Sequence, residues 1–303
     1  TTDGRPDSGF GADGKVVFSV GPHDDRAFSM VEQANGKLVV AGHSVLGINT
    51  TGMSVVRLHA DGSLDETFGS DGKYILSDAS GRKVVLQPDN KILVLGEVDD
   101  KRLGLIDKTN LNFLALRLNE DGTRDPSFGV NGVLTHELGD IVRNSVTVQN
   151  DGKFLVFGLT ALNATEFGGT GYEPVLIRLL PDGSRDLDFG DNGIWIPPSQ
   201  TELASKIRGY TVSAVAEEAD GQLLLACTRD DSSYVGDFKV VRLQPDGALD
   251  SSFGQDGLQE IDISGGSDNA YDLIVQPDGK VLLVGNGFNG SVFNFSAARL
   301  NSD

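Results

Sequence analysis

The chain has 303 residues, a formal net charge of −19, 39% hydrophobic residues and a single cysteine. This charge argues against nucleic acid and anionic membrane surfaces as partners, because no basic patch could neutralise phosphates. Cys227 has no second cysteine with which to form an intrachain disulfide. No apolar run reaches the roughly 18 residues of a membrane-spanning helix, so we expect no membrane insertion.

One short motif, Phe-Gly-x-Asp/Asn-Gly, occurs five times. Its copies are Phe10–Gly14, Phe68–Gly72, Phe128–Gly132, Phe189–Gly193 and Phe253–Gly257. Successive copies are 58, 60, 61 and 64 residues apart. A nearly fixed period of this length is typical of a stacked or ring-like repeat fold. The repeats are approximately residues 3–63, 64–123, 124–184, 185–248 and 249–303.

Each repeat contains four short apolar runs. In the first repeat they are Lys15–Val20, Ala27–Glu32, Lys37–Gly42 and Met53–His59. Such runs, rich in Val, Leu, Ile and Phe and bounded by Gly, Asp and Asn, predict strands. No segment has a convincing helical period. The pattern predicts an all-β, five-bladed propeller with four antiparallel strands per blade, folded as a single domain over residues 1–303.

The connections between the predicted strands are of two kinds. A tight turn such as Gln33–Lys37 recurs between the second and third strands, and a longer turn such as Asp61–Gly69 recurs after the fourth. The other two loops vary, and the longest are Pro197–Gly209 and Thr160–Tyr172. Because neighbouring strands alternate in direction, the constant turns should lie on one face and the variable loops on the other. Repeat proteins place their insertions on the binding face.

The two ends of the sequence are in phase with each other. The last repeat stops at Arg299–Asp303, and Asp3–Asp7 supplies the continuation found in the other repeats. We therefore expect the N-terminal strand Lys15–Val20 to join the C-terminal blade and close the ring, which would leave no free sheet edge.

Three motifs together resemble the bacterial delta-60 repeat, a predicted propeller family. They are the Phe-Gly-x-Asp-Gly core, the Gln-Pro-Asp-Gly-Lys turn at Gln276–Lys280 and the Arg-Leu-x-x-Asp-Gly segment. The resemblance covers essentially all 303 residues. It implies a bacterial protein that is secreted or at the cell surface, with the periplasm as an alternative, and often a domain of a larger protein. It implies no settled activity. Repeat four departs most, with Glu218, Gln222 and Cys227 at three motif positions.

Several repeated side chains are best interpreted as structural. An arginine in each fourth strand, such as Arg57, is expected to pair with an aspartate of the following turn, such as Asp65. The motif phenylalanines Phe68, Phe128, Phe189 and Phe253 are expected to be wedges between blades. The Asp-x-x-x-Asp turns resemble part of a calcium loop but lack the rest of its pattern, so turn closure is the favoured role.

Candidate metal ligands open the second strand of four repeats on the variable-loop face. They are Asp25, Asp78, Asp140 and Asp268, each eight or nine residues before the first residue of the tight turn. If this strand is innermost, the carboxylates ring one mouth of the channel, where several together could hold Ca²⁺. Capping of the preceding loop is the alternative.

Candidate ligand contacts are aromatic residues of the variable loops. They are Phe167, Tyr172, Tyr234 and Phe288. Aromatic rings beside Gly, Asn and Asp suit stacking on sugars or on peptide side chains, and packing over the blade ends is the competing role. No catalytic residue is assigned, because the four histidines lie in no metal or triad spacing.

The sequence favours a non-enzymatic, extracellular binding or adhesion module that presents its variable-loop face to a glycan or protein. We expect it to be a monomeric domain. One alternative is a glycan-cleaving hydrolase that uses the channel-mouth carboxylates, since glycosidases need paired carboxyl groups. The other is a structural spacer without a ligand of its own.

Overall fold

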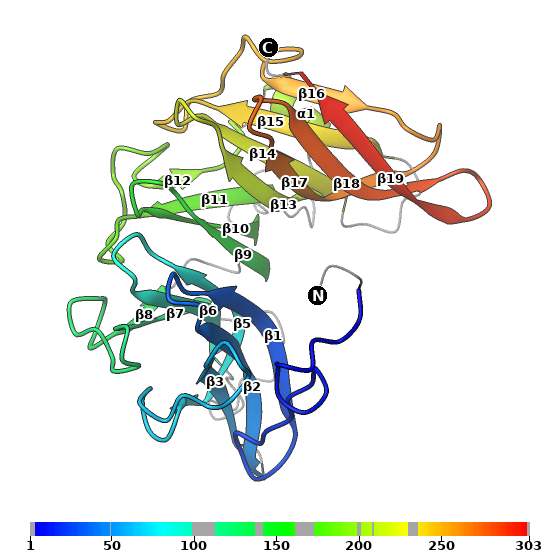
Figure 1. The fold of residues 1–303 in the computed structure, drawn as a ribbon. Helices are drawn as coiled ribbons and strands as arrows, with labels where there is room; N and C mark the ends of the chain where they lie inside the picture. The colour runs from blue at the N-terminus through cyan, green and yellow to red at the C-terminus, as the bar shows by residue number, and fades with distance from the viewer. Residues whose placement is uncertain are drawn as a thin grey trace. The chain divides into compact units, whose positions relative to one another are not determined.

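The computed structural model describes residues 4–48, 50–98, 113–136, 142–160, 173–198, 201–207, 209–229 and 236–301. The chain divides into two compact units (Figure 1). The N-terminal unit is residues 1–138 with 150–152, and the C-terminal unit is residues 139–149 with 153–303. The single-domain arrangement of residues 1–303 stays a prediction.

The N-terminal unit contains two four-stranded antiparallel sheets. The first is formed in order by β1 (Asp25–Glu32), β2 (Leu38–Gly47), β3 (Thr50–Leu58) and β4 (Lys73–Ser77). The second is formed in order by β5 (Ala79–Leu86), β6 (Ile92–Val98), β7 (Phe113–Leu118) and β8 (Val133–His136). The C-terminal unit contains the other three sheets. The third sheet has β9 (Val142–Val148), β10 (Phe154–Thr160), β11 (Glu173–Leu179) and β12 (Ile194–Trp195). The fourth has β13 (Tyr210–Glu217), β14 (Leu223–Arg229), β15 (Phe238–Leu243) and β16 (Leu258–Ile261). Its fifth sheet has three described strands, β17 (Asp268–Val275), β18 (Val281–Phe288) and β19 (Phe293–Leu300). These five antiparallel sheets confirm the predicted fold class, an all-β propeller with five blades.

The fourth strand of each complete sheet comes from the next sequence repeat. For example, β4 follows the motif at Phe68–Gly72 and pairs with β3. By the same rule the fourth strand of the fifth sheet would be Lys15–Val20, but this segment carries no strand in the structure. A strand needs a hydrogen-bonded neighbour, and among the described residues none pairs with this segment as a ladder. The predicted closure of the ring stays a prediction.

The repeated motif encodes a turn that only certain residues can make. In the second copy, Gly69, Asp71 and Gly72 have φ angles of +57°, +51° and +79°. Glycine adopts this left-handed region freely, and Asp and Asn tolerate it better than other residues. A Cβ on Gly69 would also lie 2.4 Å from the carbonyl oxygen of Lys73. The positions of Gly and of Asp or Asn in the motif are therefore set by the backbone conformation of this turn.

A second glycine position is explained by a bulge between the first two strands of the sheets. The register shifts between Ala27 and Ser29, and a Cβ on Gly42 would lie 1.9 Å from the carbonyl oxygen of Arg26. Cys227 takes the corresponding place in the fourth sheet, opposite Val212, and is fully buried. Burial raises the pKa of its thiol to about 12, so Cys227 is an inert core residue at neutral pH.

The core lies between neighbouring sheets of each unit. In the N-terminal unit, Val39 and Val55 of the first sheet belong to one buried cluster with Val94 and Leu116 of the second. Phe68 is fully buried, and its ring lies where a Cβ on Gly122 of the next blade would clash. This confirms the predicted role as a wedge between blades for Phe68. Phe189 and Phe253 likewise belong to buried clusters that join two neighbouring sheets.

A short helix that the sequence did not predict lies in the long insertion before β13. It is α1 (Glu202–Ile207), and Thr201 Oγ1 accepts a hydrogen bond from the backbone N–H of Ala204 as its N-cap. Leu203 and Ile207 bury one side. A helix of six residues is too short to show a helical period in the sequence. No helix in the described part of the chain is long and apolar enough to cross a membrane.

Candidate functional site

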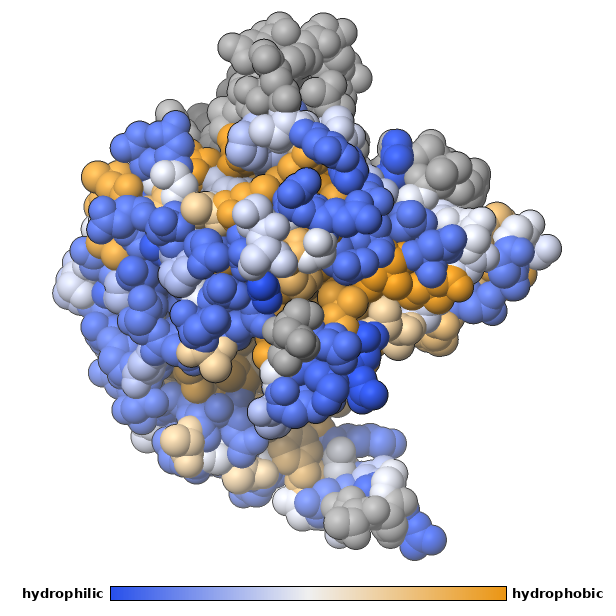
Figure 2. All heavy atoms as spheres, turned by 90° about the horizontal axis from the view of Figure 1, so that it is seen from above, coloured by the Kyte–Doolittle hydropathy of each residue, from blue (hydrophilic) through white to orange (hydrophobic). Residues whose placement is uncertain are grey.

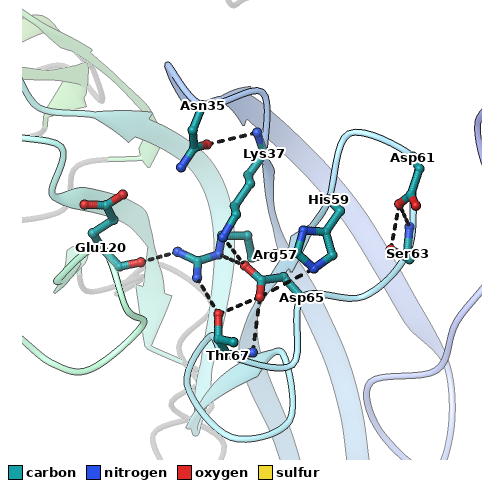
Figure 3. A network of polar contacts seen from close by, with 9 residues as sticks. All are labelled: Asn35, Lys37, Arg57, His59, Asp61, Ser63, Asp65, Thr67 and Glu120. Carbon is teal, nitrogen blue, oxygen red and sulfur yellow. Dashed lines mark hydrogen bonds and ion pairs between the residues drawn. The ribbon is translucent and has the colours of Figure 1, made fainter.

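The best-developed polar network belongs to the constant turns and is structural. Figure 3 shows Asp65 between Arg57 and Lys37. Its Oδ2 lies 2.6 Å from Arg57 Nε and 2.9 Å from Lys37 Nζ. Burial opposes ionisation of Asp65, but hydrogen bonds from Thr67, Lys37 and Arg57 outweigh it and hold the pKa of this carboxyl well below its usual range. The Arg57 guanidinium also lies 4.8 Å from the ring centre of Phe68.

The same pair recurs in three further blades, which confirms the expected structural role for four of the five repeated arginines. The Nε–Oδ2 distances are 2.8 Å for Arg117–Asp125, 2.8 Å for Arg178–Asp186 and 2.7 Å for Arg242–Asp250. The turn aspartates close their own turns as expected. Asp61, for example, accepts hydrogen bonds from the backbone N–H and the hydroxyl of Ser63. In these turns the aspartate side chain hydrogen-bonds to the residue two positions later, as in an Asx turn.

A different cluster lies at the variable-loop ends of the fourth and fifth sheets. It consists of Asp237, Asp262 and Asp268, which we call the acidic junction. One carboxylate oxygen from each lies within 4.8 Å of the others, and this is the one such group found among the described residues. Asp237 directly precedes β15, Asp262 follows β16 and Asp268 opens β17. The backbone N–H of Asp268 donates to the carbonyl of Gly236 at 2.5 Å, which joins the two blades here.

Asp268 is the buried member of the acidic junction and holds the loop before its own strand. Its side chain accepts hydrogen bonds from the backbone N–H groups of Ile263 at 2.7 Å and Ser264 at 3.2 Å. The hydroxyl of Ser264 lies 2.5 Å from the other carboxylate oxygen. This is the loop-capping geometry that the sequence left open as the alternative to metal binding.

The side chains of Asp237 and Asp262 take less part than Asp268 in holding the loop. Burial first, and then the charges of Asp262, Asp268 and Glu260, raise the pKa of Asp237. Asp262 is exposed and accepts one backbone hydrogen bond, from Gly265 at 2.7 Å. Three carboxylates that repel one another are stabilised by a cation or by a shared proton. The arrangement can therefore bind a hard divalent cation, or keep one carboxyl group protonated.

Phe288 lies beside the acidic junction. It ends β18, and its backbone N–H donates to the carbonyl of Ser267 at 2.8 Å. Its half-buried ring lies 5.0 Å from the ring of Phe293, inclined by 45°. The structure thus brings together two residues that the sequence singled out separately, Asp268 and Phe288. The other aromatic candidates, Phe167, Tyr172 and Tyr234, lie outside the described residues.

Two other metal candidates, Asp25 and Asp78, are not in the acidic junction. Asp25 opens β1 and accepts hydrogen bonds from the backbone N–H groups of Val20 at 2.9 Å and Gly21 at 3.1 Å, the same capping pattern as Asp268. Burial opposes its ionisation, but these bonds and one from Ser44 lower its pKa. Asp78 directly precedes β5 with a φ of +60°. Asp140 lies outside the described residues, so the ring of four carboxylates stays a prediction.

The sequence reasoning missed Asp237 and Asp262. The repeat pattern does not single out these two aspartates, because Glu173 in the third repeat matches the position of Asp237, Glu137 matches that of Asp262, and the other repeats have no acid at either position. The proximity of Asp237 and Asp262 to Asp268 depends on the pairing of Gly236 with Ser267 across two blades. The available signal in the sequence was an acidic residue at a loop end where most repeats have none.

The chain belongs to the family described as a domain of unknown function (DUF5122) β-propeller, whose model matches residues 33–68, 87–128, 149–189, 218–253 and 276–303. This confirms a β-propeller repeat family, while the narrower resemblance to the delta-60 repeat stays a prediction. No curated protein has significant sequence similarity to the chain.

The chain is similar to several solved structures at low identity. A protein of unknown function from Dyadobacter fermentans is 14% identical with a TM-score of 0.50, and the match covers 92% of this chain and 79% of that one. The exo-β-1,3-galactanase of Phanerochaete chrysosporium is 8% identical with a TM-score of 0.43 over 86% of this chain, and that of Clostridium thermocellum is 12% identical with a TM-score of 0.42 over 93%. The chain spans 56% and 59% of the lengths of these two enzymes.

Proposed function

We propose that this DUF5122 protein is a non-enzymatic binding or adhesion module of the bacterial cell surface or exterior, and that it presents its variable-loop face to a glycan or protein. The observation that carries the proposal is the contrast between the two ends of the sheets. At the constant end, the charged groups form the same closed ion pairs in blade after blade. At the variable end, the acidic junction leaves one carboxylate exposed, that of Asp262. Its buried member Asp268 and the backbone carbonyl of Phe288 both contact the hydroxyl of Ser264, and the ring of Phe288 lies against Phe293.

A binding role agrees with the chemistry of that end. Exposed carboxylates accept hydrogen bonds from sugar hydroxyls or pair with basic side chains, and aromatic rings supply the apolar contact. Carboxylate oxygens are also the ligands that Ca²⁺ prefers, so the proposed cofactor is Ca²⁺ at the acidic junction. A cation there would offset the mutual repulsion that raises the pKa of Asp237.

The first test is a glycan-array screen in buffer with calcium and then with a chelator. The variant is Asp262→Asn, and the matched control is Asp246→Asn, since Asp246 is also exposed and also accepts one backbone hydrogen bond, from Ala248 at 2.9 Å. We expect saturable binding that Asp262→Asn weakens at least tenfold and Asp246→Asn leaves unchanged. Equal loss in both variants contradicts a site at the acidic junction. If no glycan on the array binds, the next experiment is a pull-down of protein partners with the same two variants.

A second candidate is a glycan-cleaving hydrolase. The observation in its favour is the raised pKa of Asp237 beside two other carboxylates, since glycosidases pair a protonated acid with an ionised carboxylate. Against it, both oxygens of Asp268 are occupied by loop hydrogen bonds. Release of reducing ends from polysaccharides that Asp237→Asn abolishes, while the protein remains folded, would favour the hydrolase over the binding module.

A further inference from the structure

The dipeptide Asn-Gly occurs five times in the chain, and its chemistry makes each copy a candidate for covalent change. The copies are Asn35–Gly36, Asn131–Gly132, Asn192–Gly193, Asn286–Gly287 and Asn289–Gly290. The backbone nitrogen that follows an asparagine can attack the side-chain carbonyl carbon Cγ. Glycine hinders this attack least, because it has no Cβ. The five pairs differ in whether the fold leaves the attack open.

In four of the pairs the attacking nitrogen is engaged. Three of the glycines donate their N–H to a backbone carbonyl of their own turn. These bonds are Gly36 to Gln33 at 2.8 Å, Gly132 to Phe128 at 2.9 Å and Gly193 to Phe189 at 2.7 Å. The fourth glycine, Gly287, is buried inside β18 and pairs with both neighbouring strands. An amide nitrogen becomes a nucleophile only when it loses its proton, so these contacts protect the four pairs.

The fifth pair, Asn289–Gly290, is open. In the described part of the chain, the N–H of Gly290 has no hydrogen-bond partner. Apart from its chain neighbours, no atom lies within 4 Å of the place that a Cβ on Gly290 would take. The pair is exposed at the tip of the β18–β19 hairpin, which projects from its sheet (Figure 1). In Figure 2, hydrophilic residues reach the surface on the side to which this hairpin projects. Water and hydroxide therefore have access to this nitrogen.

The side chain of Asn289 is folded toward the Gly290 peptide. Its Oδ1 accepts hydrogen bonds from the backbone N–H groups of Ser291 at 3.1 Å and Val292 at 3.1 Å. Bonds to the residues two and three positions later draw the side chain over the peptide between them. The same two donors face the oxygen on which negative charge develops during the attack, as the donors of an oxyanion hole do. Asn289 thus combines an accessible nucleophile with a polarised carbonyl group.

We propose that Asn289 is a site of spontaneous deamidation. The Gly290 nitrogen loses its proton to hydroxide and forms a bond to Cγ of Asn289. The Cγ–Nδ2 bond then breaks, and Nδ2 takes up a proton from water and leaves as ammonia. A second water opens the resulting five-membered succinimide ring at either of its carbonyl groups, which gives aspartate or isoaspartate at position 289. The net reaction consumes one water, releases one ammonia and involves no oxidation.

The product adds a negative charge to the variable-loop end of the fifth sheet. Asp268 opens β17 and pairs with Gly287 of β18, so the acidic junction lies at the same end of this sheet as Asn289. The carbonyl of Phe288, which precedes Asn289, contacts the hydroxyl of Ser264, and this hydroxyl also contacts Asp268. Deamidation is therefore a slow change of charge near the proposed binding site, and it does not depend on what that site binds.

The test compares the five pairs within one sample. The folded protein is incubated in mildly alkaline buffer, and peptide mass spectrometry follows the mass increase that accompanies replacement of an amide by a carboxyl group. Asn35 is the matched control, because it is also exposed and its Oδ1 also accepts a backbone hydrogen bond, from Lys37 at 3.1 Å, but the nitrogen of Gly36 is engaged. We expect conversion at position 289 to be at least about tenfold faster than at position 35. In urea the two rates should become similar.

Two further measurements separate the proposed route from others. Attack by the Gly290 nitrogen gives a mixture of isoaspartate and aspartate, so aspartate alone at position 289 would show direct hydrolysis and overturn the route. Anion-exchange chromatography should show a more acidic form that accumulates in the native protein and much less in Asn289→Gln, whose longer side chain must close a larger ring. An acidic form that accumulates equally in both proteins places the reaction elsewhere. Equal rates at positions 289 and 35 in the folded protein, or a ratio that urea leaves unchanged, would show that the fold does not select Asn289.

Discussion

Two fully buried aspartates, Asp65 and Asp268, have opposite surroundings. Asp65 lies between two cations in a network that recurs in other blades, and its charge is compensated. Asp268 is held by backbone N–H groups and a hydroxyl, and two further carboxylates lie close to it. In a repeat protein, a repeated charge pair is expected to stabilise the scaffold, whereas a charge cluster found once among the described residues is the better candidate for a ligand site.

The largest expected effect breaks the compensated side of this comparison. Asp65→Asn leaves Arg57 and Lys37 without a counter-charge, and removal of one partner of a buried ion pair costs about 3–5 kcal/mol. Asp250→Asn in the fourth blade should cost less, because Gln222 replaces the lysine there and Glu218 Oε2 lies 3.8 Å from Arg242. Urea unfolding at pH 7 measures both variants. Equal losses would show that the second cation contributes nothing.

A smaller effect separates the structural and functional members of the acidic junction. Asp268→Asn replaces an oxygen that accepts loop hydrogen bonds, and a lost buried acceptor costs about 1–3 kcal/mol. Asp262→Asn changes an exposed side chain, and such changes stay within about 0.5 kcal/mol. Calcium titration by calorimetry on the same proteins adds the functional measurement. If both variants lose the same stability, Asp262 is part of the scaffold as well.

The sequence predicted the scaffold better than the site. The repeated turns, the Arg57–Asp65 pair and the Phe68 wedge were predictable because each depends on residues that recur at fixed spacing. The acidic junction was only partly predictable, because Asp237 and Asp262 join Asp268 through pairing across two blades. The strand predicted at Lys15–Val20 illustrates the same limit, since a sequence pattern cannot supply the hydrogen-bonded partner that a strand needs.

The smallest expected effect concerns Glu218, where the fourth blade departs from the repeat. Burial raises the pKa of Glu218, and its buried Oε2 has no hydrogen-bond partner among the described residues. Glu218→Gln restores the residue that most blades use. Gln87 shows the gain, because its Nε2 donates to the carbonyl of Gly152 in the next blade's turn at 3.2 Å. Return to a repeat consensus typically stabilises by about 0.5–2 kcal/mol.

The pH dependence of this gain distinguishes its cause. A raised pKa means that the folded state holds the proton of Glu218 more tightly than the unfolded state does. The contribution of Glu218 is therefore fully present below its usual pKa of about 4.5 and is lost as the pH rises through the folded value. The difference in unfolding free energy between Glu218→Gln and the native protein should consequently be larger at pH 7 than at pH 4. A gain that is equal at both pH values would assign the effect to the new hydrogen bond rather than to the buried charge.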